Sequence, residues 1–366
     1  MKKIKSILLV CNILVAILLI IIFLSKNKSP AENIIFSAIP IAYIICIFIN
    51  FIFILIWIFI KQKYILISFI AIISTISFIN RIIPLQSYIN FTNNDTNTTT
   101  IKIMSYNVNV FGLYNWNDNT IKPQILKLIK DEKPDILCLQ EAFWTDEKSN
   151  FVTIDSLKKY LNTNNVFKFA ISKAVANQNF GLAIISKFSI INKYSYKFEN
   201  SGNGFCYVDI LQNNDTIRIY NLHLQSIYFG KDDYIAIKNI STTDSIKTDF
   251  KEMVNVLKKY LKSCRQRAIQ SDLLKQNIDS CKYKIFVCGD FNDLALSYSY
   301  NTIKGNLIDS YCKRGRFSDF TWSYGKFKQR IDYMFFDKSY ICKTHKTIKK
   351  QLSDHQPIIA EFSLKK

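Results

Sequence analysis

Three long apolar stretches fill most of the first 85 residues and constrain the fold more than any other feature. They cover residues 4–24, 34–60 and 64–79, and the third extends to residue 85 if its two polar residues lie at an interface. A helix needs about 20 apolar residues to cross the hydrocarbon core of a bilayer. The alternative for the second and third stretches is buried helices of a soluble domain, and stretches of Ile and Phe without a polar face argue against it. The sequence therefore predicts three transmembrane helices.

The first stretch is too long for the apolar region of a cleaved signal peptide, and it lacks a clear small-x-small cleavage site. We therefore expect it to be retained. Lys2, Lys3 and Lys5 lie at its start, and Lys61 and Lys63 separate the second stretch from the third, whereas Lys26 and Lys28 lie in the opposite loop. Loops rich in Lys and Arg stay in the cytoplasm. This bias predicts a multi-pass protein of a bacterial inner membrane, with everything after residue 85 outside the cytoplasm.

A polar segment of low complexity, FTNNDTNTTT at residues 91–100, separates this membrane anchor (residues 1–90) from the rest of the chain. Residues 101–366 then alternate strand-like segments with a few helical ones, without a second linker or a repeat. The longest amphipathic helix is expected over residues 247–278. Strands interleaved with helices and hairpin turns predict one α/β domain with mixed sheets.

The formal net charge is +20, from 48 Lys and Arg against 28 Asp and Glu. Such a balance suits nucleic acid or an anionic membrane as a partner, but the abundance of Ile, Asn and Lys equally suits a general compositional bias. The nine cysteines include no Cys-x-x-Cys pair, which argues against a zinc site. Cys264 and Cys281 flank a helical segment and are candidates for a disulfide if the domain is exported.

Polar side chains that could take part in catalysis or bind a metal follow the predicted strands at six places. They are Asn107 in SYNV, Glu141 after ILCLQ, His223 in NLHLQS, Asp290 and Asn292 in GDFND, Asp332 in RIDYMF, and Asp354 and His355 in SDHQP. Each alone has an ordinary explanation, such as a surface turn or a carboxylate at a helix start. The chain holds only three histidines, however, and two of them lie in these clusters, so a chance placement of the whole set is improbable.

In this order the motifs resemble those of the endonuclease/exonuclease/phosphatase superfamily of metal-dependent phosphoesterases. The resemblance spans residues 102–364 and rests on SYNV, LCLQE, GLAIISK, NLHLQS, GDFND, RIDYMF and SDHQP. It implies a four-layer sandwich, in which two mixed β-sheets pack together and are flanked by helices. It also implies hydrolysis of phosphoester bonds with Mg²⁺, or with Mn²⁺ as an alternative.

The resemblance implies a set of metal ligands. Glu141 is the best candidate, Asn107 lies beside it through its amide oxygen, and Asp354 would complete the site or orient its waters. Oxygen ligands suit Mg²⁺, which keeps several waters when bound. Asn109 is a departure, because the branch of abasic-site endonucleases carries an aspartate at this position. A DNA-repair role is therefore not expected.

The resemblance also assigns the catalytic roles. Asp290 would transfer a proton, and Asn292 would position the water or the phosphate. His355 would face the scissile phosphate, with Asp332 fixing its tautomer through the other ring nitrogen. His223 would contact the phosphate or the leaving-group oxygen. Which group is the base and which the acid stays open.

Two substrate classes remain. Nucleic acid is the default, and a phospholipid, sphingomyelin or phosphoinositide head group is the rival because the anchor holds the domain near a bilayer. A hydrophobic loop beside the cleft would favour lipid, and Phe143-Trp144 and Tyr228-Phe229 are the candidates. A catalytically inactive binding module of this fold is less favoured, since every expected acid, amide and histidine is present. No obligate protein partner is expected, and the absence of an intramembrane charge pair argues for an anchor rather than a channel.

The predicted orientation is testable with reporter fusions. A reporter enzyme that is active only outside the cytoplasm should be active when it is fused after Leu85 and silent when it is fused after Lys63. The measurement is reporter activity in intact cells. Activity of a cytoplasm-only reporter after Leu85 would reverse the orientation.

Overall fold

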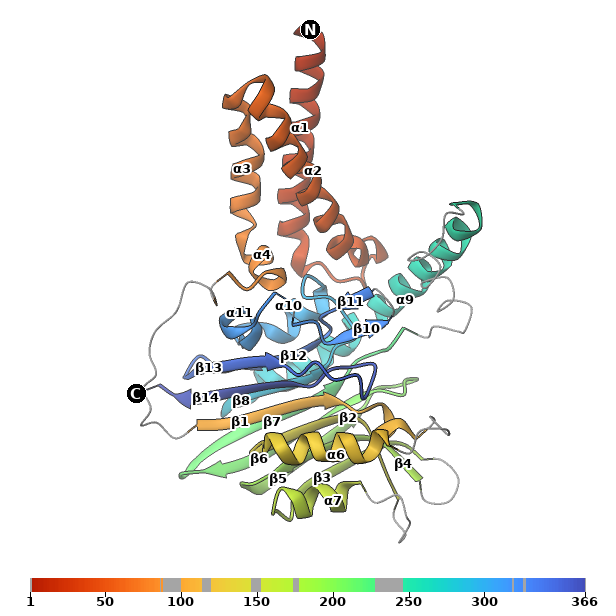
Figure 1. Ribbon diagram of the computed structural model, residues 1–366, viewed down its shortest axis with the longest axis vertical. Coiled ribbons are helices and arrows are strands. Elements are labelled where there is room, and N and C mark those ends of the chain that lie inside the picture. Colours follow the sequence, from red (N-terminus) through yellow and green to blue (C-terminus); the bar gives the residue numbers. More distant parts are fainter. Residues whose placement is uncertain are drawn as a thin grey trace.

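The computed structural model describes residues 2–85, 87, 100–113, 120–145, 153–173, 178–227, 246–317, 319–324 and 327–365. A bundle of apolar helices stands on one side of a two-sheet domain (Figure 1). Most of the predicted linker, residues 91–99, lies outside the described residues, as do Tyr228 and Phe229.

The bundle contains α1 (Lys2–Leu24), α2 (Ile39–Ile60), α3 (Ile65–Ser74) and α4 (Ile76–Ile82), with the short 3-10 segments η1 (Ser25–Asn27), η2 (Ile34–Ala38) and η3 (Gln62–Tyr64). Two helices, Lys3–Asn27 and Ile34–Ile60, are long and apolar enough to cross a membrane. The third predicted helix is broken into Gln62–Ser74 and Ile76–Ile82, which meet at 65° and make a third span only if they are counted together.

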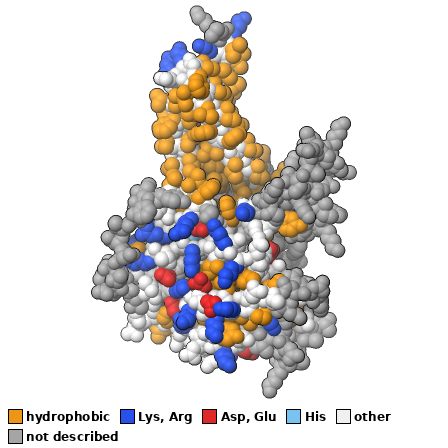
Figure 2. Space-filling view, in the orientation of Figure 1, with side chains coloured by type: hydrophobic (Ala, Val, Ile, Leu, Met, Phe, Trp, Pro, Cys, Tyr) orange, Lys and Arg blue, Asp and Glu red, His pale blue; other side chains and the backbone are white. Residues whose placement is uncertain are grey.

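A tyrosine from a neighbouring helix occupies the break. The Tyr43 hydroxyl lies 3.3 Å from the Thr75 carbonyl and 2.9 Å from Thr75 Oγ1. A side chain that inserts into the hydrogen-bond ladder of a helix bends it. In Figure 2 hydrophobic side chains cover the visible face of the bundle, and Lys and Arg side chains lie at its far tip.

The two-sheet domain contains two mixed six-stranded sheets. The first has the order β13-β14-β1-β2-β4-β3 and the second β5-β6-β7-β8-β12-β9. Their bounds are β1 (Thr100–Asn107), β2 (Ile136–Thr145), β3 (Asn165–Lys173), β4 (Gln178–Ser186), β5 (Ser189–Lys197), β6 (Gly204–Gln212), β7 (Asp215–His223), β8 (Lys284–Asp290), β9 (Ile308–Asp309), β12 (Asp332–Phe336), β13 (Tyr340–Thr347) and β14 (Ile358–Leu364). The pairs β1–β2 and β7–β8 are parallel. A separate hairpin joins β10 (Trp322–Tyr324) to β11 (Phe327–Gln329).

Three apolar cores separate four layers. Residues such as Ile103, Ile219 and Phe286 fill the space between the sheets. The first sheet packs its outer face on α6 (Ile121–Glu132) and α7 (Ile154–Tyr160). The second packs on α9 (Ile246–Asp279) and α10 (Tyr298–Lys304), near α11 (Ser310–Arg314). The predicted sandwich of two mixed sheets flanked by helices is confirmed, although α10, α11 and β13 were not foreseen.

Partly buried polar contacts attach the bundle to the two-sheet domain. Arg81 Nη1 donates to Asn301 Oδ1 at 2.7 Å, and Arg330 Nη2 donates to the Arg81 carbonyl at 2.9 Å. The Tyr311 hydroxyl donates to the Ile82 carbonyl at 2.8 Å. Leu296 of the domain is buried in the same apolar cluster as α1 and α2. The end of α4 is therefore seated on the second sheet's helices.

The suggested disulfide does not form. Cys264 and Cys281 are both free. One lies within α9 and the other just beyond its end, so at about 1.5 Å per helical residue they are roughly 25 Å apart. A disulfide requires Cα atoms within about 7 Å.

Gly289 lies inside β8, next to its last residue. Its φ is +147°, and a Cβ there would stand 2.1 Å from the Leu222 carbonyl oxygen of β7. The close approach of two backbones thus requires glycine. It brings the ends of β7 and β8, and with them His223 and Asp290, into register.

Replacing Gly289 by Ala should destabilise the protein by roughly 3 kcal/mol or more, because it adds a steric clash and a strained φ at one position. Gly202→Ala is the matched control, since no atom lies within 4 Å of the position that an added Cβ would take, and it should change stability by less than about 0.5 kcal/mol. Thermal unfolding of the detergent-solubilised full chain measures both. Equal melting temperatures for the two variants would contradict the close approach.

Candidate active site

Strand ends from both sheets meet on one side of the sandwich. Asn107 ends β1 and Glu141 lies in β2 of the first sheet. His223 ends β7, Asp290 ends β8 and Asp332 begins β12 of the second. Because β8 and β12 are antiparallel, Asp290 and Asp332 are direct partners in register. The fold thus brings together residues that lie up to 248 positions apart, counting to His355 just before β14.

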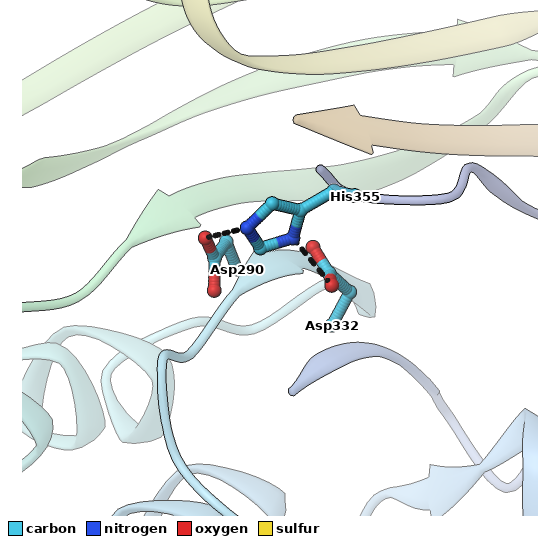
Figure 3. Close-up of side chains that lie close together, drawn as sticks. All are labelled: Asp290, Asp332 and His355. Carbon is cyan, nitrogen blue, oxygen red and sulfur yellow. Dashed lines mark hydrogen bonds and ion pairs between the residues drawn. The ribbon is translucent and has the colours of Figure 1, made fainter. Parts of the chain in front are cut away.

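His355 lies between two carboxylates (Figure 3). Its Nδ1 is 2.9 Å from Asp332 Oδ2, and its Nε2 is 3.6 Å from Asp290 Oδ2. All three side chains are at most 5% exposed. Burial lowers the pKa of His355, but Asp332 and Asp290 outweigh it and raise the pKa well above its usual range. Burial raises the pKa of Asp332 to about 6 against the lowering effect of His355. Both shifts arise because the imidazole and the carboxylate are buried together and titrate as a pair.

Asn107 connects the two sheets. Its Nδ2 donates to Glu141 Oε1 at 3.1 Å and to Asp290 Oδ2 at 3.0 Å. Glu141 stands at a β-bulge of β2 with φ of +49°, and its side chain is 37% exposed, whereas Asp290 is fully buried. One amide thus faces two carboxylates, one open to solvent and one enclosed.

His223 and Asn292 also lie beside Asp290. His223 Nε2 lies 3.5 Å from Asp290 Oδ2 and 3.7 Å from Glu141 Oε1. The backbone N–H of Asn292 donates to Asp290 Oδ1 at 2.8 Å, and its Nδ2 donates to the Leu224 carbonyl at 3.0 Å. Its φ is +51°, which asparagine tolerates better than most residues. Asn292 therefore fixes the Asp290 carboxylate and the end of β7 at the same time.

Asp354 lies at the exposed rim. Its Oδ1 accepts from Asn109 Nδ2 at 3.1 Å and from its neighbour Ser353 at 3.1 Å, and Ser353 Oγ also donates to the Asn107 carbonyl at 2.9 Å. Within the described residues no hydrogen bond joins its carboxylate to Asn107 or Glu141. Asn109 belongs to η4 (Asn109–Gly112), in which three successive non-glycine residues have φ of 40–56°. Sequence reasoning treated Asn109 only as a departure, yet this turn aims it at Asp354.

Other supporting residues were not anticipated. Thr321 Oγ1 accepts from the backbone N–H of Asp332 at 3.0 Å, and Ser226 Oγ lies 3.4 Å from His223 Nε2. Beneath the site, Gln140 Nε2 donates to Asn221 Oδ1 at 2.7 Å, and Asn221 Nδ2 donates to the Leu139 carbonyl at 2.9 Å. The sequence offered one signal for Gln140 and Asn221: each is a polar residue inside a predicted strand and close to a motif residue.

The donor set fits a hard divalent cation. Glu141 and Asp290 present carboxylates to one point at Asn107, and oxygen donors suit such ions. Asp290, Asp332 and His355 also place ligand atoms within 4.8 Å of one another. In that group, however, Asp332 holds one ring nitrogen of His355 and Asp290 lies near the other, which favours a proton-holding array. The half-exposed Glu141 beside Asn107 is better placed for a hydrated ion.

Phe143 and Trp144 do not form an exposed loop. They lie in β2, 1% and 5% exposed, and pack into the core between the first sheet and its helices. The sequence ended that strand before Glu141, but β2 continues to Thr145. These aromatics therefore lend no support to a lipid substrate.

Comparisons with known proteins agree with this fold. The model of the endonuclease/exonuclease/phosphatase family matches residues 104–355, and a model described as a domain of unknown function matches residues 5–82. None of the curated proteins matches the sequence. A structure of the human Nocturnin catalytic domain with bound sulfate has 18% identity, covers 73% of this chain and 95% of its own, and superposes with a TM-score of 0.52.

Bacterial structures are similar to the same degree. An endonuclease/exonuclease/phosphatase from Bacteroides vulgatus has 15% identity, covers 73% of this chain and 100% of its own, and has a TM-score of 0.52. One from Bacteroides thetaiotaomicron has 16% identity, covers 74% and 100%, and has a TM-score of 0.51. At these identities the structures establish the fold. With the family model covering most of the two-sheet domain, the chain belongs to the endonuclease/exonuclease/phosphatase family, and it is a phosphoesterase by fold.

The His355 array makes an electrostatic prediction. Asp332→Asn removes the closest negative charge and should lower the pKa of His355 by about one to three units. With three histidines in the chain, NMR titration of isotope-labelled imidazole in metal-free protein can follow it. Asp337→Asn, a carboxylate outside the site, is the control. An unchanged His355 pKa in Asp332→Asn would rule out the ion pair.

Proposed function

We propose that this protein is a membrane-anchored, Mg²⁺-dependent hydrolase of phosphodiester bonds, with nucleic acid as the default substrate class. The observation that carries the proposal is the placement of the Asp290–His355–Asp332 array directly beside the Asn107–Glu141 pair. The Asp290–His355–Asp332 array can hold protons, and the Asn107–Glu141 pair can hold a cation. Phosphoryl transfer needs both functions at one phosphorus atom.

We assign each residue a role according to its burial and its neighbours. Glu141 and Asn107 would hold the ion, with Asp354 and Asn109 orienting its waters from the rim. When bound, Mg²⁺ or Mn²⁺ supplies a Lewis acid that withdraws charge from a phosphoryl oxygen. The Oδ2 atom of Asp290 lies close to Nε2 of His223 and to Nε2 of His355.

Proton movement falls to the enclosed groups. Asp290 would accept a proton from the attacking water, with Asn292 holding its carboxylate in place. His355, kept protonated by Asp332, would place positive charge against the phosphate where charge develops. His223, close to both Asp290 and Glu141, would contact the phosphate or the leaving-group oxygen.

A phospholipid or sphingomyelin head group is the second candidate substrate, and the contact between the helix bundle and the two-sheet domain favours it. Arg330 donates to the Arg81 carbonyl of α4 at 2.9 Å and precedes Asp332 by two residues. The strand that bears Asp332 is thereby fixed to the end of the bundle, which would hold the cleft at a constant height above a bilayer. We infer that the catalytic domain works at the outer face of a bacterial inner membrane.

Glu141→Gln should lower Mg²⁺-dependent turnover by about a thousandfold, since it removes the ligand charge and keeps the shape. Glu199→Gln, an exposed glutamate elsewhere, should leave turnover unchanged. The assay uses the purified full chain with bis-p-nitrophenyl phosphate, with and without EDTA. Wild-type turnover by Glu141→Gln would refute the metal assignment.

A substrate panel then separates the candidates. DNA, RNA, sphingomyelin vesicles, phosphoinositides and simple phosphomonoesters are compared at equal phosphate concentration with Mg²⁺. Preference for DNA or RNA supports the default, and preference for lipid vesicles supports the second candidate. No hydrolysis of any member would favour an inactive binding module.

A further inference from the structure

Three cationic side chains gather at the junction of the bundle and the two-sheet domain. Lys26 lies in η1 after α1, Arg81 in α4, and Lys304 at the end of α10. Asn301, one helical turn before Lys304, contacts the other two residues. Its Oδ1 accepts from Arg81 Nη1 at 2.7 Å, and its Nδ2 donates to the Lys26 carbonyl at 3.4 Å. Residues three apart share a helix face, so the cluster forms along one side of α10.

Acidic side chains do not neutralise this cluster. Within the described part of the chain, none of the three cations lies within 4.0 Å of a carboxylate oxygen. Asp309 acts on Lys304 from a distance, but its Oδ2 is already bonded by Arg330 at 2.9 Å and by the Tyr300 hydroxyl at 2.8 Å. Burial, and then the charges of Arg81 and Lys26, lower the pKa of Lys304. An anion would relieve this repulsion.

The cluster lies where the apolar surface of the bundle ends. Lys26 Nζ stands 4.3 Å from the centre of the Phe23 ring, and Arg81 Cζ stands 4.7 Å from that of Phe78, with the two rings 5.0 Å apart. Leu24 beside them is 69% exposed. Figure 2 shows hydrophobic side chains giving way to Lys and Arg where the bundle meets the domain. If the helices span a bilayer, these cations stand at the depth of the lipid phosphates.

We propose that Lys26, Arg81 and Lys304 form a binding site for the phosphate head group of an anionic membrane lipid. The head group would bridge the anchor, which supplies Lys26 and Arg81, and the catalytic domain, which supplies Lys304. The acyl chains would lie along the exposed apolar side chains of α1 and α4. This lipid is a bound partner of the junction and is distinct from any substrate of the active site.

The test measures lipid binding by the delipidated full chain in detergent, using native mass spectrometry. Phosphatidylglycerol should bind, and phosphatidylcholine should bind far more weakly. Lys304→Gln should weaken phosphatidylglycerol binding about fivefold, and the double variant Lys26→Gln with Lys304→Gln roughly thirtyfold. Lys304→Arg should retain it. The matched control is Lys193→Gln with Lys197→Gln on β5, an edge strand, and it should bind like wild type.

Four results would overturn the proposal. The first three are equal binding of both lipids, equal loss in the β5 control and the junction variant, and displacement of the lipid by inorganic phosphate at the same concentration. The third would identify a site for free phosphate, and the fourth concerns the active site. Glu141→Gln in EDTA should bind phosphatidylglycerol normally, and loss in this variant would place the lipid in the catalytic cleft instead. None of these binding measurements depends on turnover, so the lipid site at the junction and the proposed hydrolysis are tested independently.

Discussion

The hydrogen bonds of Asn107 are the contacts on which the geometry of the site depends. One amide nitrogen reaches Asp290 at 3.0 Å and Glu141 at 3.1 Å, and so joins a residue of each sheet. Two carboxylates that face a common point repel each other, more strongly where water is scarce. Their approach is tolerated because amide donors and histidine ring nitrogens surround Asp290. The same concentration of negative charge makes the point a natural place for a cation.

This contact needs two sheets that cannot slide, and a buried polar layer beneath the site provides that constraint. Gln140 and Asn221 are fully buried and bond each other across the sheets at 2.7 Å. Apolar packing between sheets is nondirectional, whereas a buried amide without its partner costs free energy. Sliding by one residue would break these bonds, so they hold β2 against β7 in the register that aligns the strand ends.

A second buried interaction ties the site to the anchor. Arg330 is 9% exposed and bonds Asp309 at 2.9 Å while donating to the Arg81 carbonyl of α4. A buried ion pair contributes little net stability, but the loss of one partner is costly. The pair therefore acts chiefly through position, because it fixes the start of β12, where Asp332 lies, relative to the end of α4. His345, to which the sequence assigned no role, lies beside this pair in β13 and bonds Ser310 at 2.9 Å.

The sequence by itself determined the features that depend on local pattern. The length of the apolar stretches indicated the N-terminal apolar helices, the alternation of strands and helices indicated the α/β class, and the motif residues at strand ends indicated that Asn107, Asp290, Asp332 and His355 are neighbours. Tertiary structure alone decided features that arise from contacts distant in sequence. The bend at Thr75 comes from a hydroxyl on another helix, and the left-handed bulge at Glu141 comes from strand pairing across the sheet. The placement of Asp354 at the rim, held by Asn109, and the seat of Arg81 against Arg330 likewise join segments 245 and 249 residues apart. No local propensity encodes such contacts, because their geometry exists only when the sheets and helices have packed.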